Sequence, residues 1–295
     1  MKKYKTYRKY FFILGLFLVL SACSTTENNT KEPELPVEVT KAVTFTVIGD
    51  VPYGDTQRDG LINMISKHNT LTSSEFIVHV GDIKRGADPC NEAVYADVSG
   101  LLKSFKAPTF MLLGDNEYND CANPVQAFDY WKQYFLKFHE NWAFDQKITY
   151  QTIRAENFSW IQEKILFVGL NIVGSSVHNQ TEWTQRLTDN AEFLNEQIAI
   201  NKNNIKAIVV MAHANMVEAG PVKFEPFTVP FRAAATSFQK PILYLQGDGH
   251  FWFTNKPWPE QNITRVQIDG GTKAVQITVD VNKENPFSFN RTFLD

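Results

Sequence analysis

The amino-acid sequence predicts an α/β fold built around a parallel sheet. Three short apolar runs, Val43–Ile48, Phe76–Val80 and Thr109–Leu113, are each followed by the dipeptide Gly-Asp. Helix-compatible stretches lie between them, at about residues 58–68 and 91–105. Short apolar runs that alternate with helices are typical of βαβ units. Three aspartates therefore follow strands at the carboxyl edge of one sheet, where α/β proteins gather their ligands.

The second half of the chain repeats this pattern. Strand Ile205–Met211 leads into Ala212-His213, and strand Pro241–Gln246 leads into Gly247-Asp248-Gly249-His250. Residues 181–201 are expected to form a helix, because apolar side chains recur there at intervals of three or four. The remaining expected strands are a hairpin of Phe158–Ile161 and Ile165–Val168, and antiparallel strands Arg265–Ile268 and Ala274–Val281 around Gly270-Gly271.

The composition is that of a globular protein. The chain has 295 residues, of which 43% are hydrophobic and 21% charged, which excludes a disordered chain, a collagen-like repeat and a coiled coil. Its 23 phenylalanines can supply a large core. Since no linker-like composition occurs beyond the first 40 residues, we expect a single domain over residues 41–295.

Residues 1–22 have the features of a secretory signal peptide. A basic stretch precedes the apolar run Phe11–Leu20, which is shorter than the roughly 20 residues that span a bilayer. An interfacial or short membrane anchor is the alternative. The segment Leu20-Ser21-Ala22-Cys23 resembles a bacterial lipobox, which implies lipidation of Cys23 as the new N-terminus. We therefore expect an extracytoplasmic, membrane-anchored bacterial lipoprotein on the periplasmic or cell-surface face, with residues 23–40 as a polar, flexible tether.

The charge of the mature chain limits which partners it can bind, and its cysteines predict a disulfide. Loss of residues 1–22 would leave 24 basic and 32 acidic side chains, a net charge of −8. Such a chain repels polyanions, so bulk nucleic-acid binding is not expected. Cys90 and Cys121 follow Asp82 and Asp115 in two loops that the predicted sheet places side by side. In an oxidising compartment these thiols are expected to form a disulfide; two free thiols are the alternative.

Four carboxylates and two imidazoles follow the predicted strands. Carboxylates that converge without cations repel one another, and bound divalent metal removes this conflict. Six ligands exceed the needs of one metal with an open position, and they suit two metals that share a carboxylate. Such pairs of metals acidify a water and neutralise the charge on a phosphate during its hydrolysis. The six candidate ligands are Asp50, Asp82, Asp115, His213, Asp248 and His250.

These motifs resemble the signature of the calcineurin-like metallophosphoesterases, which include the purple acid phosphatases. Five blocks stand in the family's order, and the resemblance runs from about residue 43 to 282. The blocks are Gly49-Asp50-Val51-Pro52, Gly81-Asp82, Gly114-Asp115-Asn116-Glu117, Met211-Ala212-His213 and Gly247-Asp248-Gly249-His250. The resemblance implies two mixed β-sheets packed as a sandwich flanked by helices, and hydrolysis of a phosphate-ester substrate.

The resemblance also implies a division of the ligands between two metals. One metal would take Asp50, Asp82 and His250. The other would take Asp115, His213 and Asp248, and Asp82 would bridge both. Because oxygen ligands predominate, manganese, iron or magnesium is favoured over zinc.

The sequence departs from the family at several positions. Pro52 and Asp248 replace ligand histidines, and Asp115 replaces an asparagine. Asn116 replaces the histidine that helps to bind phosphate and protonates the leaving group; an amide can donate a hydrogen bond but cannot deliver a proton. Tyr53 and Tyr118 are candidates for the tyrosine ligand of purple acid phosphatases. These departures leave open a catalytically impaired surface lipoprotein of the same fold, acting as a binding protein.

Other polar residues have weaker signals. Lys84 and Arg85 follow Asp82 and are candidate phosphate contacts, with an ordinary solvated pair as the alternative. Glu117 is expected to be structural. His68 and His139 lie on helix-like stretches and are expected to be surface or cap residues.

Overall fold

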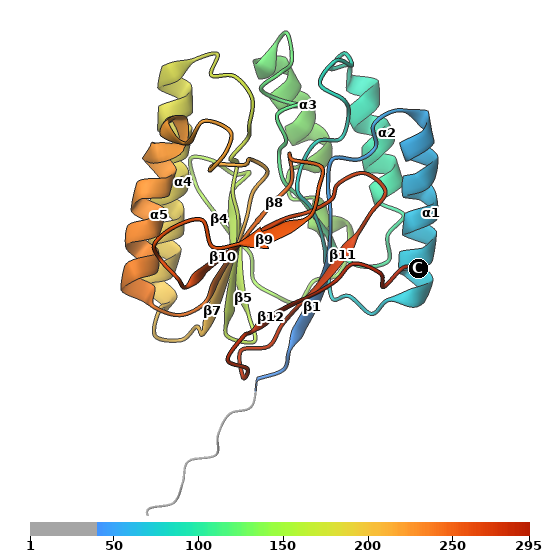
Figure 1. The fold of residues 1–295 in the computed structure, drawn as a ribbon. Helices are drawn as coiled ribbons and strands as arrows, with labels where there is room; N and C mark the ends of the chain where they lie inside the picture. The colour runs from blue at the N-terminus through green and yellow to red at the C-terminus, as the bar shows by residue number, and fades with distance from the viewer. Residues whose placement is uncertain (1–39) are drawn as a thin grey trace, which may run out of the picture. The chain divides into compact units, whose positions relative to one another are not determined.

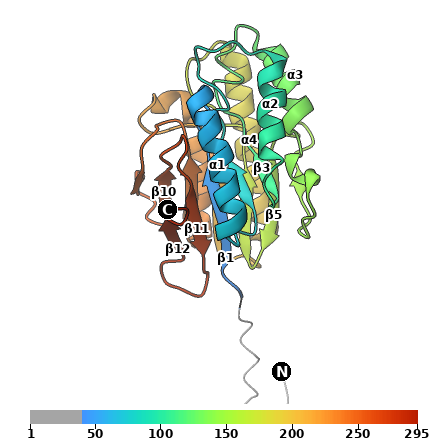
Figure 2. The ribbon, with the colours of Figure 1, turned by 90° about the vertical axis from the view of Figure 1, so that its right-hand side faces the viewer.

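A computed structural model describes residues 40–295 of the chain. The predicted signal peptide, Cys23 and the tether up to residue 39 lie outside the described residues. Two sheets pack face to face, and helices cover the outer face of each (Figures 1 and 2). The predicted α/β sandwich of two mixed sheets flanked by helices is therefore confirmed. Across residues 40–295, every helix is too short or too polar to traverse a bilayer.

The first sheet has five strands in the order β12-β11-β1-β2-β3. Strands β1, β2 and β3 run parallel, whereas β11 and β12 run antiparallel to their neighbours. Helices α1, α2 and α3 pack on the outer face of this sheet (Figure 1). The bounds are β1 Val43–Ile48, α1 Asp55–Leu71, β2 Ile77–His79, α2 Glu92–Leu102, β3 Thr109–Met111, α3 Pro124–Phe135, β11 Val275–Val279 and β12 Phe287–Asn290.

The second sheet has seven strands in the order β4-β5-β6-β7-β8-β10-β9. Its central strands β6, β7, β8 and β10 are parallel. Helices α4 and α5 cover its outer face. The bounds are η1 Phe138–Asn141, β4 Thr149–Tyr150, β5 Phe158–Gln162, β6 Ile165–Gly169, α4 Gln180–Asn201, β7 Ala207–Met211, η2 Pro221–Phe224, α5 Glu225–Phe238, β8 Ile242–Gln246, β9 Phe253–Asn255 and β10 Ile263–Gln267.

The apolar runs in the sequence are strands that are buried on both faces. In β7, Val209 and Met211 face the first sheet, whereas Ile208 and Val210 face the layer of α4 and α5. Successive side chains of a strand point to opposite faces, so a strand between two packed layers is apolar throughout. The parallel strands of both sheets direct their carboxyl ends toward one end of the molecule, which is where the candidate ligands lie.

The predicted pairing of the last strands is wrong. The chain forms β10 and β11 near the expected positions, but they belong to different sheets. Strand β10 pairs with β8 and β9, and β11 pairs with β1 and β12. Gly270 and Gly271, with φ of 70° and 61°, lie in the segment that carries the chain from one sheet to the other. This backbone conformation favours glycine, so the Gly-Gly pair marks a crossover rather than a hairpin.

Candidate metal centre

The six candidate ligands meet at the carboxyl ends of strands from both sheets. Asp50, Asp82 and Asp115 follow strands of the first sheet, and the other three follow β7 and β8 of the second. Donor atoms of Asp50, Asp82 and His213 lie within 4.8 Å of one another, as do those of Asp115, His213 and Asp248. Side chains from motifs that are far apart in the sequence therefore form a single cluster between the two sheets.

His213 is oriented by the backbone of the neighbouring sheet. The ring is fully buried, and its Nδ1 donates a hydrogen bond of 2.8 Å to the carbonyl oxygen of Val80. This contact fixes the tautomer and leaves Nε2 facing the carboxylates. Nε2 lies 3.0 Å from Asp115 Oδ1 and 3.4 Å from Asp82 Oδ1, yet within residues 40–295 it makes no hydrogen bond of good geometry. A buried nitrogen in this situation is suited to a metal ion.

Asp50 offers a second buried atom without a partner. Its Oδ1 accepts a 3.0 Å hydrogen bond from the backbone N–H of Asp248, and lies 3.2 Å from His250 Nε2. Its Oδ2 is buried and has no hydrogen-bond partner among the described residues. Buried polar atoms are nearly always satisfied, so an unpaired oxygen and an unpaired nitrogen in one cluster fit a bound cation.

The electrostatics of the cluster also fit a cation. Burial raises the pKa of Asp82 and of Asp248. Burial lowers the pKa of His213, but the carboxylates of Asp82 and Asp115 outweigh it and raise that pKa well above its ordinary value. Burial likewise opposes ionisation of Asp115, but the adjacent His213 ring, with Nε2 3.0 Å from Asp115 Oδ1, brings the pKa of Asp115 below the usual range. Divalent metal would take the place of protons in this cluster.

Four of the candidate ligands have a left-handed backbone. The φ angles are 54° at Asp50, 63° at Asp82, 70° at Asp248 and 58° at His250. Side chains other than glycine seldom adopt this region, and such residues cost of order 1–3 kcal/mol each and cluster at functional sites. The turns that follow the strands thus direct these four side chains toward the cluster, and their backbone conformation lowers the local stability.

Glu117 holds the turn that carries Asp82. It is fully buried, and its carboxylate accepts hydrogen bonds from the backbone N–H groups of Gly114 (2.6 Å), Asp82 (3.2 Å) and Ile83 (3.2 Å). It thereby joins the turn after β2 to the turn after β3. These contacts are those of a structural acid.

Asn116 and Tyr53 both contact Asp82. The backbone N–H of Asn116 donates to Asp82 Oδ1 at 3.0 Å, and its side-chain amide donates to Asp82 Oδ2 and to the Tyr53 hydroxyl. That hydroxyl in turn donates to Asp82 Oδ2 at 2.6 Å and lies 3.4 Å from His250 Nε2. Burial and the Asp82 carboxylate raise the pKa of Tyr53. Of the two candidate tyrosines, Tyr53 is therefore at the cluster, whereas the Tyr118 hydroxyl donates to Glu182.

Lys84 and Arg85 make contacts within their own loop. The ammonium of Lys84 donates to the backbone carbonyls of Arg85 (3.1 Å) and Asp88 (2.9 Å), and the Lys84 side chain is buried. The guanidinium of Arg85 pairs with the Asp88 carboxylate at 2.9 Å. Their role in phosphate binding stays a prediction.

The predicted disulfide between Cys90 and Cys121 is present. It joins the loop after β2 to the loop after β3. Both sulfurs lie against the carbonyl oxygen of Asn116, at 3.7 Å and 3.6 Å. The disulfide therefore borders the turn that presents Asn116 to the cluster.

Sequence reasoning missed a buried arginine behind the cluster. Arg265 on β10 is fully buried and forms two hydrogen bonds with the Glu218 carboxylate, at 2.6 and 2.7 Å. It also donates to Asn215, two residues after His213, and to Asn255 of β9, the strand that follows His250. Arg265 thus ties together the segments that follow the two candidate histidines. An isolated arginine in a strand gives no sequence signal for this role.

Comparison with known proteins agrees with this fold and site. The family profile described as calcineurin-like phosphoesterase matches residues 43–245. A sequence search of curated proteins finds no significant match. Since the profile covers more than half of the chain, the protein belongs to the calcineurin-like phosphoesterase family. The predicted family resemblance is confirmed, and family and site together support a metal-dependent phosphoesterase with divalent metal ions.

Solved structures with a similar fold share little sequence with the chain. A dimetal phosphatase from Danio rerio is 11% identical with a TM-score of 0.54, over 80% of this chain and 95% of that one. GAP50, the anchor in the inner membrane complex of Plasmodium, is 12% identical with a TM-score of 0.52, over 85% and 88%. The purple acid phosphatase PPD1 from yellow lupin is 10% identical with a TM-score of 0.51, over 82% of this chain and 50% of its own. At these identities the likeness concerns the fold.

Proposed function

We propose that this protein hydrolyses phosphoesters with two metal ions bound among the six converging side chains. The observation that carries the proposal is the meeting of Asp50 Oδ2 and His213 Nε2, both buried and without a hydrogen-bond partner among the described residues, inside a group of carboxylates. When bound, the two ions would supply Lewis acidity, which lowers the pKa of water and neutralises charge on phosphate oxygens.

The residues of the chain have distinct tasks in this proposal. Asp82 belongs with Asp50 and His213 to one of the two groups of donor atoms, and in this proposal its carboxylate would be shared by the two ions. Glu117 and the Val80 carbonyl hold Asp82 and His213 in place through the hydrogen bonds described above. The Asn116 amide, whose two N–H groups donate to Asp82 and Tyr53 in this structure, would turn one of them to a phosphate oxygen, which orients the phosphorus for in-line attack.

The direct test is hydrolysis of a chromogenic aryl phosphate with added Mn²⁺. The wild-type protein should turn over the ester, and Asp82→Ala should lose activity because the shared ligand is gone. Equal rates for the two proteins would contradict the proposal. Metal analysis of protein purified without chelator should find manganese, iron or magnesium, and a zinc-only result would contradict the preference for oxygen-binding metals.

A second candidate function is ligand binding without turnover. It is favoured by Asn116, whose amide already donates to Asp82 and Tyr53 and cannot protonate a leaving group. The fold of the Plasmodium anchor GAP50 is similar to that of this chain. In this case wild type and Asp82→Ala would be equally inactive, but Mn²⁺ would bind only to the wild type.

We also propose that the mature protein begins at a lipidated Cys23 and is held on the extracytoplasmic face of the membrane. The basic and apolar segments before Leu20-Ser21-Ala22-Cys23 support this. Mass spectrometry of the N-terminal peptide should show an acylated cysteine. Cys23→Ala should release the protein from the membrane fraction, and an unmodified Met1 on the native protein would contradict the proposal.

A further inference from the structure

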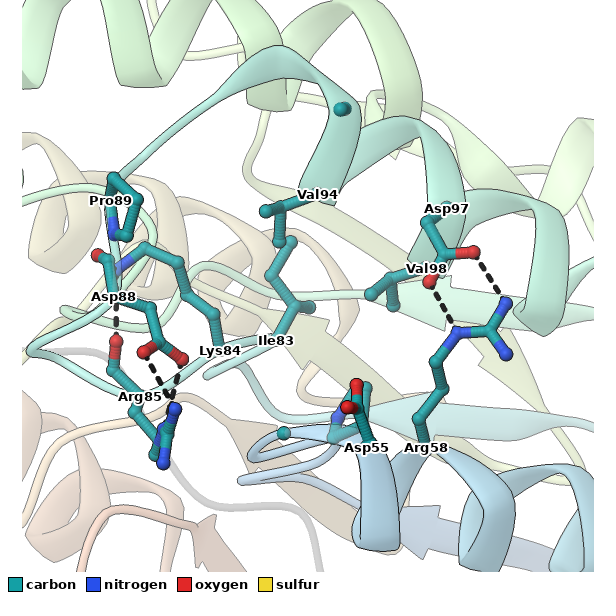
Figure 3. A pocket seen from close by; sticks show the side chains of 13 residues that line it. Asp55, Arg58, Ile83, Lys84, Arg85, Asp88, Pro89, Val94, Asp97 and Val98 are labelled. Atoms are coloured by element: carbon teal, nitrogen blue, oxygen red, sulfur yellow. Dashed lines mark hydrogen bonds and ion pairs between the residues drawn. The ribbon is translucent and has the colours of Figure 1, made fainter.

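A cavity of about 410 Å³ is lined by residues of the loops that follow Asp50 and Asp82 (Figure 3). It opens between the N-terminal turns of α1 and α2, at the end of the first sheet where the candidate ligands lie. One wall begins at Pro52, two residues after Asp50, and another begins at Ile83, directly after Asp82. The cavity and the cluster therefore share the loops after β1 and β2.

Two arginines at the rim are held by carboxylates but keep hydrogen-bond donors that are not used. Arg58 donates from Nε and Nη2 to Asp97, at 2.8 and 2.6 Å. Arg85 donates from Nε and Nη2 to Asp88, at 3.0 and 2.9 Å. Each guanidinium keeps its Nη1 group without a hydrogen bond to any residue between 40 and 295. Since the carboxylates already set the orientation of both side chains, the two Nη1 groups are prearranged donors.

Asp55 supplies an acceptor between the two arginines. It is the first residue of α1, and its exposed carboxylate makes no hydrogen bond or ion pair within the described part of the chain. Figure 3 shows it between the side chains of Arg85 and Arg58. The rim thus offers hydrogen-bond donors and an acceptor within one cavity.

The charge and the floor of the cavity restrict what it can bind. The cations Arg58, Arg85 and Lys84 line it together with the anions Asp55, Asp88 and Asp97, so its formal charge is zero. A balanced rim does not favour a second phosphate or another strong anion. The floor is apolar: Ile83 and Val98 are buried, and Val94 is half-buried. A flat ring can pack against such aliphatic side chains.

We infer that this cavity is the subsite for the alcohol portion of the phosphoester. The group that fits is uncharged and ring-bearing, with acceptors for the two Nη1 groups and a hydroxyl or amine donor for Asp55. This is the chemistry of a nucleoside. The volume lies within the range of about 300–1,000 Å³ that is typical of small-molecule sites. The inference rests on the proposed phosphoester hydrolysis, because it assigns the part of the substrate that is not the phosphate.

A bulky residue at the rim provides the first test. Ala93 lines the cavity from α2 and is exposed, so Ala93→Trp fills the cavity without disturbing the core. The kcat/KM for adenosine 5′-monophosphate, relative to that for methyl phosphate, should fall at least tenfold, mainly through KM. Val125→Trp introduces the same ring on α3, outside the cavity, and should leave this ratio unchanged. An unchanged ratio in Ala93→Trp would overturn the subsite, as would a larger loss for glucose 6-phosphate than for the nucleotide.

A binding experiment separates the subsite from the chemistry. Adenosine should bind the wild-type protein in calorimetry, and Asp55→Asn should weaken this binding at least threefold. Asp59→Asn is the matched control, because Asp59 lies on the same helix near Arg58 but does not line the cavity. If methyl phosphate is hydrolysed and adenosine does not bind, the subsite is wrong and the proposed function stands. If no ester is hydrolysed and adenosine binds in an Asp55-dependent way, the proposed function is wrong and the cavity is still a nucleoside site.

Discussion

At the scale of single residues, Asn116 sets the chemistry that the proposed site can perform. Its amide donates hydrogen bonds at Asp82 but has no proton to give to a departing alcohol. General acid catalysis typically contributes about 10²–10⁴-fold. Esters with poor leaving groups should therefore react slowly, and the rate should fall steeply as the pKa of the leaving alcohol rises.

The measurement is kcat across a series of aryl and alkyl phosphates. Asn116→His should raise kcat for alkyl esters at least tenfold and should change kcat for aryl esters little. A rate that does not depend on the leaving group in the wild-type protein would contradict this role for Asn116.

His68 makes the stability of the fold dependent on pH. His68 and His139 were expected to be surface or cap residues, but both side chains are buried, because their helices turn them toward the core. Burial lowers the pKa of His68 from 6.5 to about 4, and its Nε2 lies 3.0 Å from Thr46 Oγ1. The unfolded chain therefore binds a proton at this residue more readily than the folded chain between pH 6.5 and about 4.

Stability from this histidine is fully present above pH 6.5 and is lost as the pH falls toward 4. His68→Gln removes the titration and keeps a polar group for Thr46. In urea unfolding, the loss of stability from pH 7 to pH 5 should be smaller for this variant than for the wild type. Parallel losses in the two proteins would show that His68 does not contribute.

At the scale of elements, Arg265 couples the segments that follow β7 and β8. Its hydrogen bonds with Glu218 and Asn215 fix the chain after His213, while Asn255 and the Phe253 ring, 4.6 Å from the guanidinium, belong to β9. Groups that orient metal ligands typically change metal affinity by about 10–100-fold. Arg265→Lys should therefore weaken Mn²⁺ binding by at least tenfold.

Calorimetric titration with Mn²⁺ measures this effect. Arg232→Lys is the matched control, since the Arg232 side chain makes the same two-bond contact with Glu260 and, among the described residues, has no hydrogen bond to Asn215 or Asn255. A wild-type affinity in Arg265→Lys, with the fold intact by circular dichroism, would contradict the positioning role.

The elements differ in how well the sequence predicts them. Strand β1 was predicted with its observed bounds and α4 within one residue, because apolar side chains mark their buried faces. Helix α5 was not predicted, because Pro226 and Pro230 are residues that normally argue against a helix. Pro226 lies in the first turn of α5, where proline is tolerated. Helix α3 was missed although Asn123 caps it and Pro124 opens it. Strand β4 has two residues, too few to show a period.

At the scale of the whole molecule, the candidate site stabilises the fold only when a cation is present. The carboxylates are buried near one another, and burial raises the pKa of Asp82 and Asp248. An ion that binds only the folded state, at a free concentration 100 times its Kd, adds about 2.7 kcal/mol to the free energy of unfolding. Chelation should therefore lower Tm by about 5–10 °C, at roughly 2–4 °C per kcal/mol for a chain of this size.

Thermal unfolding with and without Mn²⁺ measures this difference. Asp82→Ala should have a Tm that does not respond to Mn²⁺, because the shared ligand is absent. A wild-type Tm that is equal in chelator and in Mn²⁺ would contradict metal binding in the cluster.

The sequence predicts the fold and the convergence of the candidate ligands better than it predicts strand pairing and side-chain contacts. Five polar motifs after apolar strands predicted which side chains meet, since parallel strands share a carboxyl edge. The pairing of β10 and β11 with different sheets could not be predicted, because alternation of apolar residues marks a buried face but not its partner strand. The contacts of Asn116, Tyr53 and Arg265 depend on side chains that only tertiary packing brings together.

The division of the candidate ligands between two separate sheets has a mechanical consequence. Asp50, Asp82 and Asp115 move with one sheet, and His213, Asp248 and His250 with the other. A cation held by both groups would make local opening of either sheet depend on the other. Amide protons near the ends of β1 and β7 would then exchange with solvent at a common slow rate in the loaded protein, and at two independent rates once the ion is withdrawn.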